Sequence, residues 1–308
     1  MRYRTDLAKE ACEGFEEEGG IQNEAFEHYG IEGNRVSILT AAAAEKTGKP
    51  IGKYISIESR AILDRNIEQY HSISLVLAEE LKKMLSGIDQ KDTVLVAGLG
   101  NDAMTPDSVG PKTVEKTFVT RHIFEYLPAQ IDERMRPVCA FAPGVLGVTG
   151  IESADMISSV CKKADVKAIL VIDALAARRS ERIFSTFQLT DTGIEPGAGV
   201  GNKRSALNQA ALGVPVIAIG IPTVVYAATL VYDAVEDLLI SATGQDNETV
   251  REAAEKATVQ KMQDMVVTPK EIDIIAQDSA KILADGINLA LHRDITLDEI
   301  LAERMREL

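Results

Sequence analysis

The chain has 308 residues, of which 45% are hydrophobic and 26% charged, and its formal net charge is −14 at pH 7. This is ordinary globular composition, and the acidic balance argues against direct binding to nucleic acid or to a membrane surface, which needs basic residues. No apolar run reaches the ~18–20 residues of a membrane-spanning helix and no apolar segment follows the first positive charges, so we expect no anchor, no secretory signal and a cytoplasmic location.

The N-terminal third gives weak signals. The first thirty residues are polar and acidic, and we expect them to form a helix that packs late or a mobile arm. Short strands are predicted at Val36–Leu39 and Lys53–Ile57, around a Gly/Pro turn. Apolar residues at helical spacing predict a helix over Ser72–Leu85.

The pattern changes at Thr93, where compact apolar runs begin: TVLVAG, PVCAFAPGV, VKAILVIDA, ERIFSTFQLTD and GVPVIAIGIPT. Several are continuous rather than alternating, which is typical of strands buried on both faces. Helical patterns separate them at Thr113–Tyr126, Ser153–Lys163 and Ser205–Leu212. We therefore predict an α/β fold with a mostly parallel sheet flanked by helices, in a single domain over residues 1–308.

The C-terminal region, residues 230–308, is predicted to be a mainly helical extension of that domain. Thr268 is the expected N-cap of its first long helix, with Pro269 in the first helical position and Glu271 completing a capping box. The sequence TLDE at Thr296 repeats the capping signal for a final helix.

Two aspartates follow predicted strands. Asp107 stands six residues after Asn101 in the loop after TVLVAG, and Asp173 ends the run AILVID. Ligands collect beyond the carboxyl ends of strands in open parallel sheets. If the two strands are neighbours, both carboxylates enter one crevice.

The chemistry of such a pair has several interpretations. Two close carboxylates do not both ionise cheaply, so one becomes a general acid and the other a general base that activates water against a peptide carbonyl. The same pair can also hold a divalent metal. Alternatively, each aspartate caps a helix, which is the simpler interpretation of Asp107 from periodicity alone, and the chain is a non-enzymatic ligand-binding module.

Longer motifs carry a resemblance to a known family. They are RTDLAKEA, GKPIGKYISIES, GLGNDAMTPDSVGPKTVEKTFVTRH, APGVLGVTGIES, VIDALAARRSERIFSTFQLTDTGIEPGAGVGNKRSALNQAALGVPVIAIGIPTVV and VTPKEIDIIAQDSAKILADGINLALH. In this set and order, from Arg4 to about His292, the chain resembles the germination protease of spore-forming Firmicutes. The resemblance implies a fold related to the hydrogenase maturation proteases.

The resemblance also implies an activity. The family is an atypical class of aspartic endopeptidase that starts the degradation of small acid-soluble spore proteins, without a cofactor or metal. Its proposed catalytic aspartates correspond to Asp107, in TPDSVGP, and Asp173, in IDALAAR. By the same resemblance we expect a homotetramer in the forespore or spore core. Because relatives carry a propeptide ahead of the RTDLA block, residues 1–20 are a possible propeptide or mobile arm. A metal-dependent maturation-type peptidase with the same carboxylates as ligands is the alternative.

Substrate-binding residues are expected on two further segments. Gly197, Gly199 and Gly201 lie in a glycine-rich loop whose N–H groups would stabilise an oxyanion or dock an extended substrate; an ordinary turn cluster is the alternative. Since the family cleaves at a site containing glutamates, basic side chains would bind the substrate's acidic residues, unless they only coat a solvated surface. The candidates are Arg178, Arg182, Lys203 and Arg204.

Overall fold

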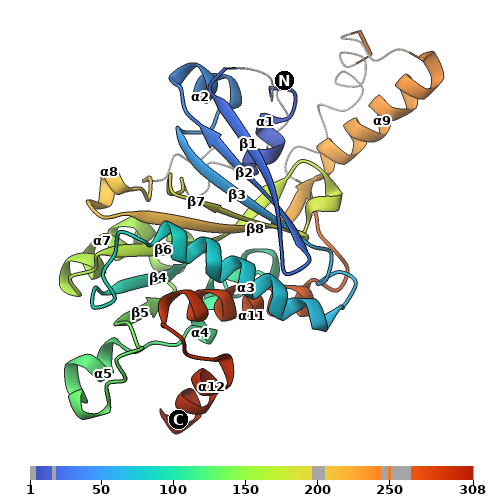
Figure 1. The fold of residues 1–308 in the computed structure, drawn as a ribbon. Helices are drawn as coiled ribbons and strands as arrows, with labels where there is room; N and C mark the ends of the chain where they lie inside the picture. The colour runs from blue at the N-terminus through green and yellow to red at the C-terminus, as the bar shows by residue number, and fades with distance from the viewer. Residues whose placement is uncertain (1–4, 16–18, 196–204, 245–248, 251–264, 308) are drawn as a thin grey trace.

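The computed structural model describes residues 5–15, 19–195, 205–244, 249–250 and 265–307, and Figure 1 shows their arrangement around one sheet. The described strands follow the order β1-β2-β3-β7-β8-β6-β4-β5, with β9 paired to β8. Their bounds are β1 (Ile21–His28), β2 (Ile31–Ile38), β3 (Gly52–Glu58), β4 (Val94–Gly98), β5 (Val138–Phe141), β6 (Ala168–Ala177), β7 (Thr186–Thr190), β8 (Val216–Tyr226) and β9 (Val266–Val267).

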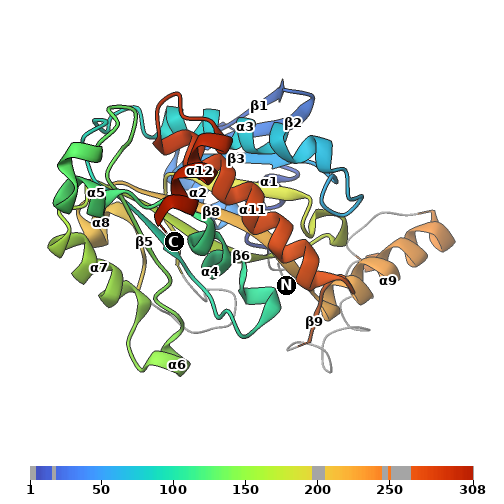
Figure 2. The same ribbon diagram turned by 90° about the horizontal axis from the view of Figure 1, so that it is seen from below.

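Helices cover both faces of this sheet (Figures 1 and 2). The described α-helices are α1 (Ala8–Cys12), α2 (Ala41–Thr47), α3 (Ile67–Met84), α4 (Val109–Lys116), α5 (Arg121–Tyr126), α6 (Leu146–Thr149), α7 (Ser153–Lys163), α8 (Gln209–Leu212), α9 (Ala227–Thr243), α11 (Ile272–Leu291) and α12 (Leu297–Glu307). Single 3₁₀ turns are η1 (Thr105–Asp107), η2 (Pro128–Gln130) and η3 (Ser180–Arg182). No helix in the described part of the chain combines the length and apolarity needed to cross a bilayer.

The two faces of strand β6 define the core. Leu170 and Ile172 pack in the cluster that includes Ile282 of α11, and α11 lies against α3 and α4. Ile169 and Val171, on the opposite face, pack in the cluster that includes Ile157 and Cys161 of α7. Successive side chains of β6 point to opposite faces of the sheet, and both faces are buried. This explains why the apolar run is continuous.

The α/β fold with a helical C-terminal region is confirmed, but the sheet is mixed rather than mostly parallel. Strands β5, β4, β6 and β8 pair in parallel, as predicted. The other described pairs are all antiparallel. For β1 and β2 the reason is the short connection: Tyr29 and Gly30, both with positive φ, form a two-residue turn, which is too short for a parallel crossover.

Two local predictions in the first half of the chain were wrong. The expected N-terminal helix or arm includes strand β1, a mostly exposed strand held by its pairing with β2. The expected helix Thr113–Tyr126 is broken into α4 and α5. At the break, Phe118 N–H donates to Asn288 Oδ1 at 2.8 Å and Thr120 N–H to Val138 O at 3.0 Å, so tertiary partners replace helical ones.

Helix boundaries elsewhere range from accurate to shifted. The prediction Ser153–Lys163 matches α7. Thr268 does not cap α11, because that helix begins at Ile272. The Thr268 hydroxyl instead donates a hydrogen bond to Thr223 O of β8 at 2.8 Å. The box at Thr296 is confirmed, because Glu299 Oε2 accepts from Thr296 N–H at 2.8 Å and Glu299 N–H donates to Thr296 Oγ1 at 3.3 Å.

Burial of His292, which follows α11, predicts a pH dependence of stability. Burial lowers the pKa of His292 from 6.5 to about 4, and its Nδ1 accepts from Arg136 N–H at 3.3 Å. Below pH 6.5 this histidine binds a proton in the unfolded chain, whereas in the folded chain it stays neutral down to about pH 4. The free energy of unfolding therefore falls as the pH falls through this window. The loss approaches about 3 kcal/mol at the lower end.

Urea unfolding of the wild type and His292→Gln at pH 7 and pH 4.5 tests this. We expect the acid-induced loss of stability to be smaller in the variant by about 2 kcal/mol. The same loss in both proteins would contradict a buried neutral imidazole.

Candidate active site

The loop after β4 folds back tightly on the sheet. Leu99 N–H donates to Ile172 O of β6 at 2.8 Å. A Cβ on Gly98 would lie 2.2 Å from Gly110 O, and one on Gly100, whose φ is +112°, would lie 2.0 Å from Asp107 O. The glycines of the GLG motif thus allow the chain to return against its own strand, with Asp107 beside the turn.

Asp107 is the last residue of η1, and Asn101 N–H donates to its side-chain Oδ2 at 2.9 Å. The same N–H also lies 3.1 Å from the Asp107 carbonyl oxygen. The N-cap of α4 is Ser108, and no side chain makes a capping hydrogen bond there. Capping of α4 therefore does not explain Asp107, whereas the nearby N-terminus of α4 favours a negative charge.

Asp173 lies within β6 rather than at its end, because the strand continues to Ala177. The parallel neighbour β4 ends opposite Ile172, so Asp173 is the first residue of β6 beyond the end of β4. Its Oδ1 accepts from Ala174 N–H at 3.0 Å. Since η1 packs against β6, Asp107 in the segment after β4 and Asp173 on β6 both lie beyond the carboxyl end of β4. The joint catalytic role stays a prediction.

The remaining predicted site residues divide into two groups. Gly197, Gly199, Gly201, Lys203 and Arg204 lie outside the described residues. Arg178 directly follows β6, and its Nη2 lies 3.6 Å from Asp233 Oδ1 of α9.

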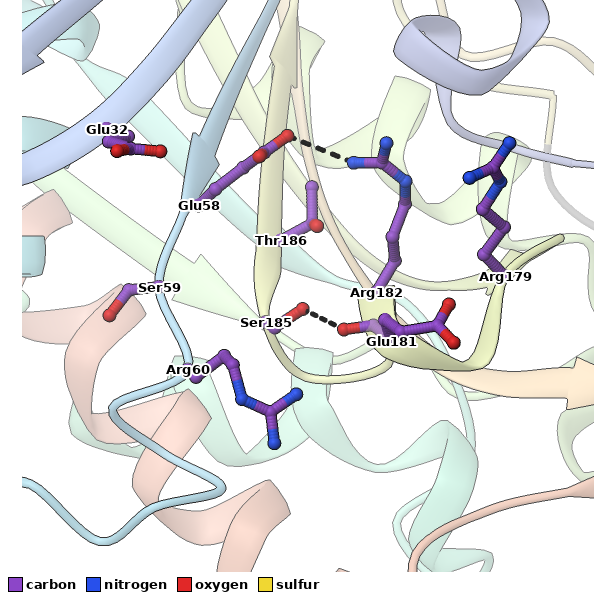
Figure 3. Close-up of a pocket in the computed structure, with 9 residues that line it drawn as sticks. All are labelled: Glu32, Glu58, Ser59, Arg60, Arg179, Glu181, Arg182, Ser185 and Thr186. Atoms are coloured by element: carbon purple, nitrogen blue, oxygen red, sulfur yellow. Dashed lines mark hydrogen bonds and ion pairs between the residues drawn. The ribbon is translucent and has the colours of Figure 1, made fainter.

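Arg182, also predicted to bind substrate, is engaged in a network of ion pairs, of which Figure 3 shows the one with Glu58. Its Nη1 lies 3.0 Å from Glu58 Oε1 and its Nη2 lies 3.2 Å from Glu13 Oε1. Its Nε lies 3.3 Å from Oε1 of Glu10, whose side chain is 0% exposed. The Arg182 side chain is 15% exposed and has three carboxylate partners, and its role in binding substrate stays a prediction.

Sequence reasoning missed Asp6 and Glu10, which dock the N-terminal segment on the end of β6. Asp6 Oδ2 accepts from Ala176 N–H at 2.8 Å. Glu10 accepts from the N–H groups of Arg178 and Arg179 at 2.8 and 3.0 Å. Both acids stand in the RTDLAKEA block, four residues apart, but nothing local indicates a partner that lies about 170 residues away.

A cavity of about 490 Å³ lies at the ends of β3 and η3 and the start of β7. Strand β3 runs parallel to β6, and β7 and β8 lie between them. The cavity therefore opens at the same end of these strands as the aspartates. Figure 3 shows its lining: Glu32, Glu58, Ser59, Arg60, Arg179, Glu181, Arg182, Ser185 and Thr186. Mixed charges of this kind suit a polar polypeptide segment better than an apolar ligand.

A family model described as germination protease matches residues 4–263 of the chain. The chain belongs to the germination protease family. The germination protease of Clostridium tetani is 42% identical over 319 residues, which cover 97% of this chain and 98% of that protein. That of Bacillus subtilis is 37% identical over 348 residues, with 95% and 94% covered.

Membership in the germination protease family makes the chain a peptidase of spores. Among solved structures, the NiFe hydrogenase maturation protease HycI from Thermococcus kodakarensis matches 68% of this chain and 97% of its own, with 15% sequence identity and a TM-score of 0.37. This is a distant similarity.

Proposed function

We propose that this chain is an endopeptidase that starts the degradation of small acid-soluble spore proteins during germination, and that Asp107 and Asp173 activate the attacking water. The observation that supports the mechanism is that the strand before Asp107 and the strand that carries Asp173 are parallel neighbours. Asp107 follows β4 and Asp173 lies on β6, and these strands pair in parallel at the edge where ligands collect.

The surroundings of the aspartates suggest which one is the base. Asp107 accepts the Asn101 N–H and lies near the N-terminus of α4, and both features favour its charged form. Asp107 then takes a proton from water as the water oxygen attacks the peptide carbonyl carbon, while Asp173 donates its proton to the carbonyl oxygen. When the tetrahedral intermediate collapses, Asp107 passes its proton to the leaving amine and Asp173 regains one from the hydroxyl.

The function is tested by incubating the purified chain with a purified small acid-soluble spore protein and mapping the products by mass. We expect a few defined internal cuts, at the same rate with and without a chelator. An intact substrate would overturn the proposed function. Activity that is lost with chelator and restored by one divalent ion would instead assign the carboxylates as metal ligands.

A further inference from the structure

Arg178 and Asp233 form an ion pair at the far end of the strand that carries Asp173. Arg178 stands five residues after Asp173. At a rise of ~3.3 Å per residue, and with the irregularity between Leu175 and Ala176, the two residues lie about 15 Å apart. An extended polypeptide with its scissile bond at Asp173 would place its fourth or fifth residue beside Arg178.

The pair has poor geometry for an arginine and a carboxylate. The distance from Arg178 Nη2 to Asp233 Oδ1 is 3.6 Å, which is too long for a hydrogen bond, and the buried Oδ1 has no hydrogen-bond partner. Burial raises the pKa of Asp233, and the neighbouring Arg178 offsets this only in part. A carboxylate that reached the guanidinium in the usual two-bond arrangement would bind it better than Asp233 does.

The neighbouring charges have other partners. Glu236, one turn later on α9, accepts a hydrogen bond from Tyr232 OH at 3.0 Å. Arg179 lies 3.3 Å from Glu13. Asp233 therefore faces Arg178 as an ion-pair partner.

We infer that Asp233 is a specificity-determining residue: it occupies Arg178 in the free enzyme and is displaced by an acidic residue of the substrate, four or five positions from the cut. The inference rests on the proposed endopeptidase function. Because Asp233 competes with the substrate's carboxylate, its removal strengthens binding of acidic substrates alone, through KM rather than kcat.

Matched peptides test the exchange. One series carries a single Glu at positions two to seven from the cleaved bond, and the other carries Gln at the same positions. In Asp233→Asn we expect kcat/KM for the peptide with Glu at the fourth or fifth position to rise about two- to fivefold, as expected for a partly exposed ion pair. The Gln peptides should be unaffected. Arg178→Gln should abolish both the preference for Glu and the effect of Asp233→Asn.

Asp237→Asn, a charge change on an exposed residue one turn further along α9, is the control and should behave as wild type. Asp233→Ala repeats the test with a second substitution at the same position. Binding of both peptides to Asp107→Asn, with and without Asp233→Asn, repeats it without turnover. Equal effects on Glu and Gln peptides, or weaker binding of the Glu peptide, would overturn the inference. If the wild type cleaved neither series, the proposed function would fail. The binding comparison would still show whether Asp233 competes with the Glu of the peptide for Arg178.

Discussion

Asparagine at position 107 or 173 should lower kcat/KM on a protein substrate by about a thousandfold, within the range that general acid–base groups contribute. The amide has the shape of the carboxylate and keeps an oxygen for the N–H groups of Asn101 and Ala174. It does not accept the water proton or supply one. Melting temperature should therefore stay within a few degrees while cleavage, measured by mass, is lost.

Asp102→Asn is the matched control for this experiment. Asp102 lies in the same loop, but its side chain is 56% exposed and lies 2.6 Å from Lys112 Nζ. We expect this variant to cleave at the wild-type rate. If Asp107→Asn or Asp173→Asn kept more than about a tenth of wild-type activity, the general acid–base role would be untenable.

The second large effect concerns stability. Arg182→Met should lower the free energy of unfolding by about 3 kcal/mol, because it leaves the carboxylate of Glu10 buried without its cation. Removing one partner of a buried pair costs more than the pair itself is worth, since the remaining charge stays desolvated. Urea unfolding at pH 7 measures the difference.

Arg179→Met is the control for that substitution. Arg179 contacts Glu13 at 3.3 Å, but its side chain is 54% exposed. An exposed pair is worth less than about 1 kcal/mol, so this variant should unfold close to wild type. Equal losses for Arg182→Met and Arg179→Met would show that burial of Glu10 does not govern the stability of this network.

The sequence predicted best where one local pattern determines the structure. The strands β4, β6 and β8 contain continuous apolar runs, a pattern typical of strands that are buried on both faces. Helix α7 has its amphipathic pattern and its bounds in one segment. Strands β4 and β6 are neighbours, which is the condition on which the proposed pairing of Asp107 and Asp173 depends.

The failures share a cause, which is a partner distant in sequence. Strand β1 is polar and exists because β2 pairs with it, and the break between α4 and α5 exists because Asn288 bonds Phe118 N–H. Asp233 belongs to a helix whose sequence gives no indication that Arg178 is near. Such contacts are not periodic, so no window of the sequence contains them.

The claim that Asp107 and Asp173 act as one unit is tested most directly by a double-mutant cycle on kcat/KM. The wild type, Asp107→Asn, Asp173→Asn and the double variant are compared on one protein substrate by long incubation and quantitative mass analysis. Groups that handle the same proton transfers lose their joint contribution when either is removed. We predict that the double variant is no slower than the slower single variant. Losses that multiply, so that the double variant is slower by the product of the two single effects, would contradict a shared mechanism.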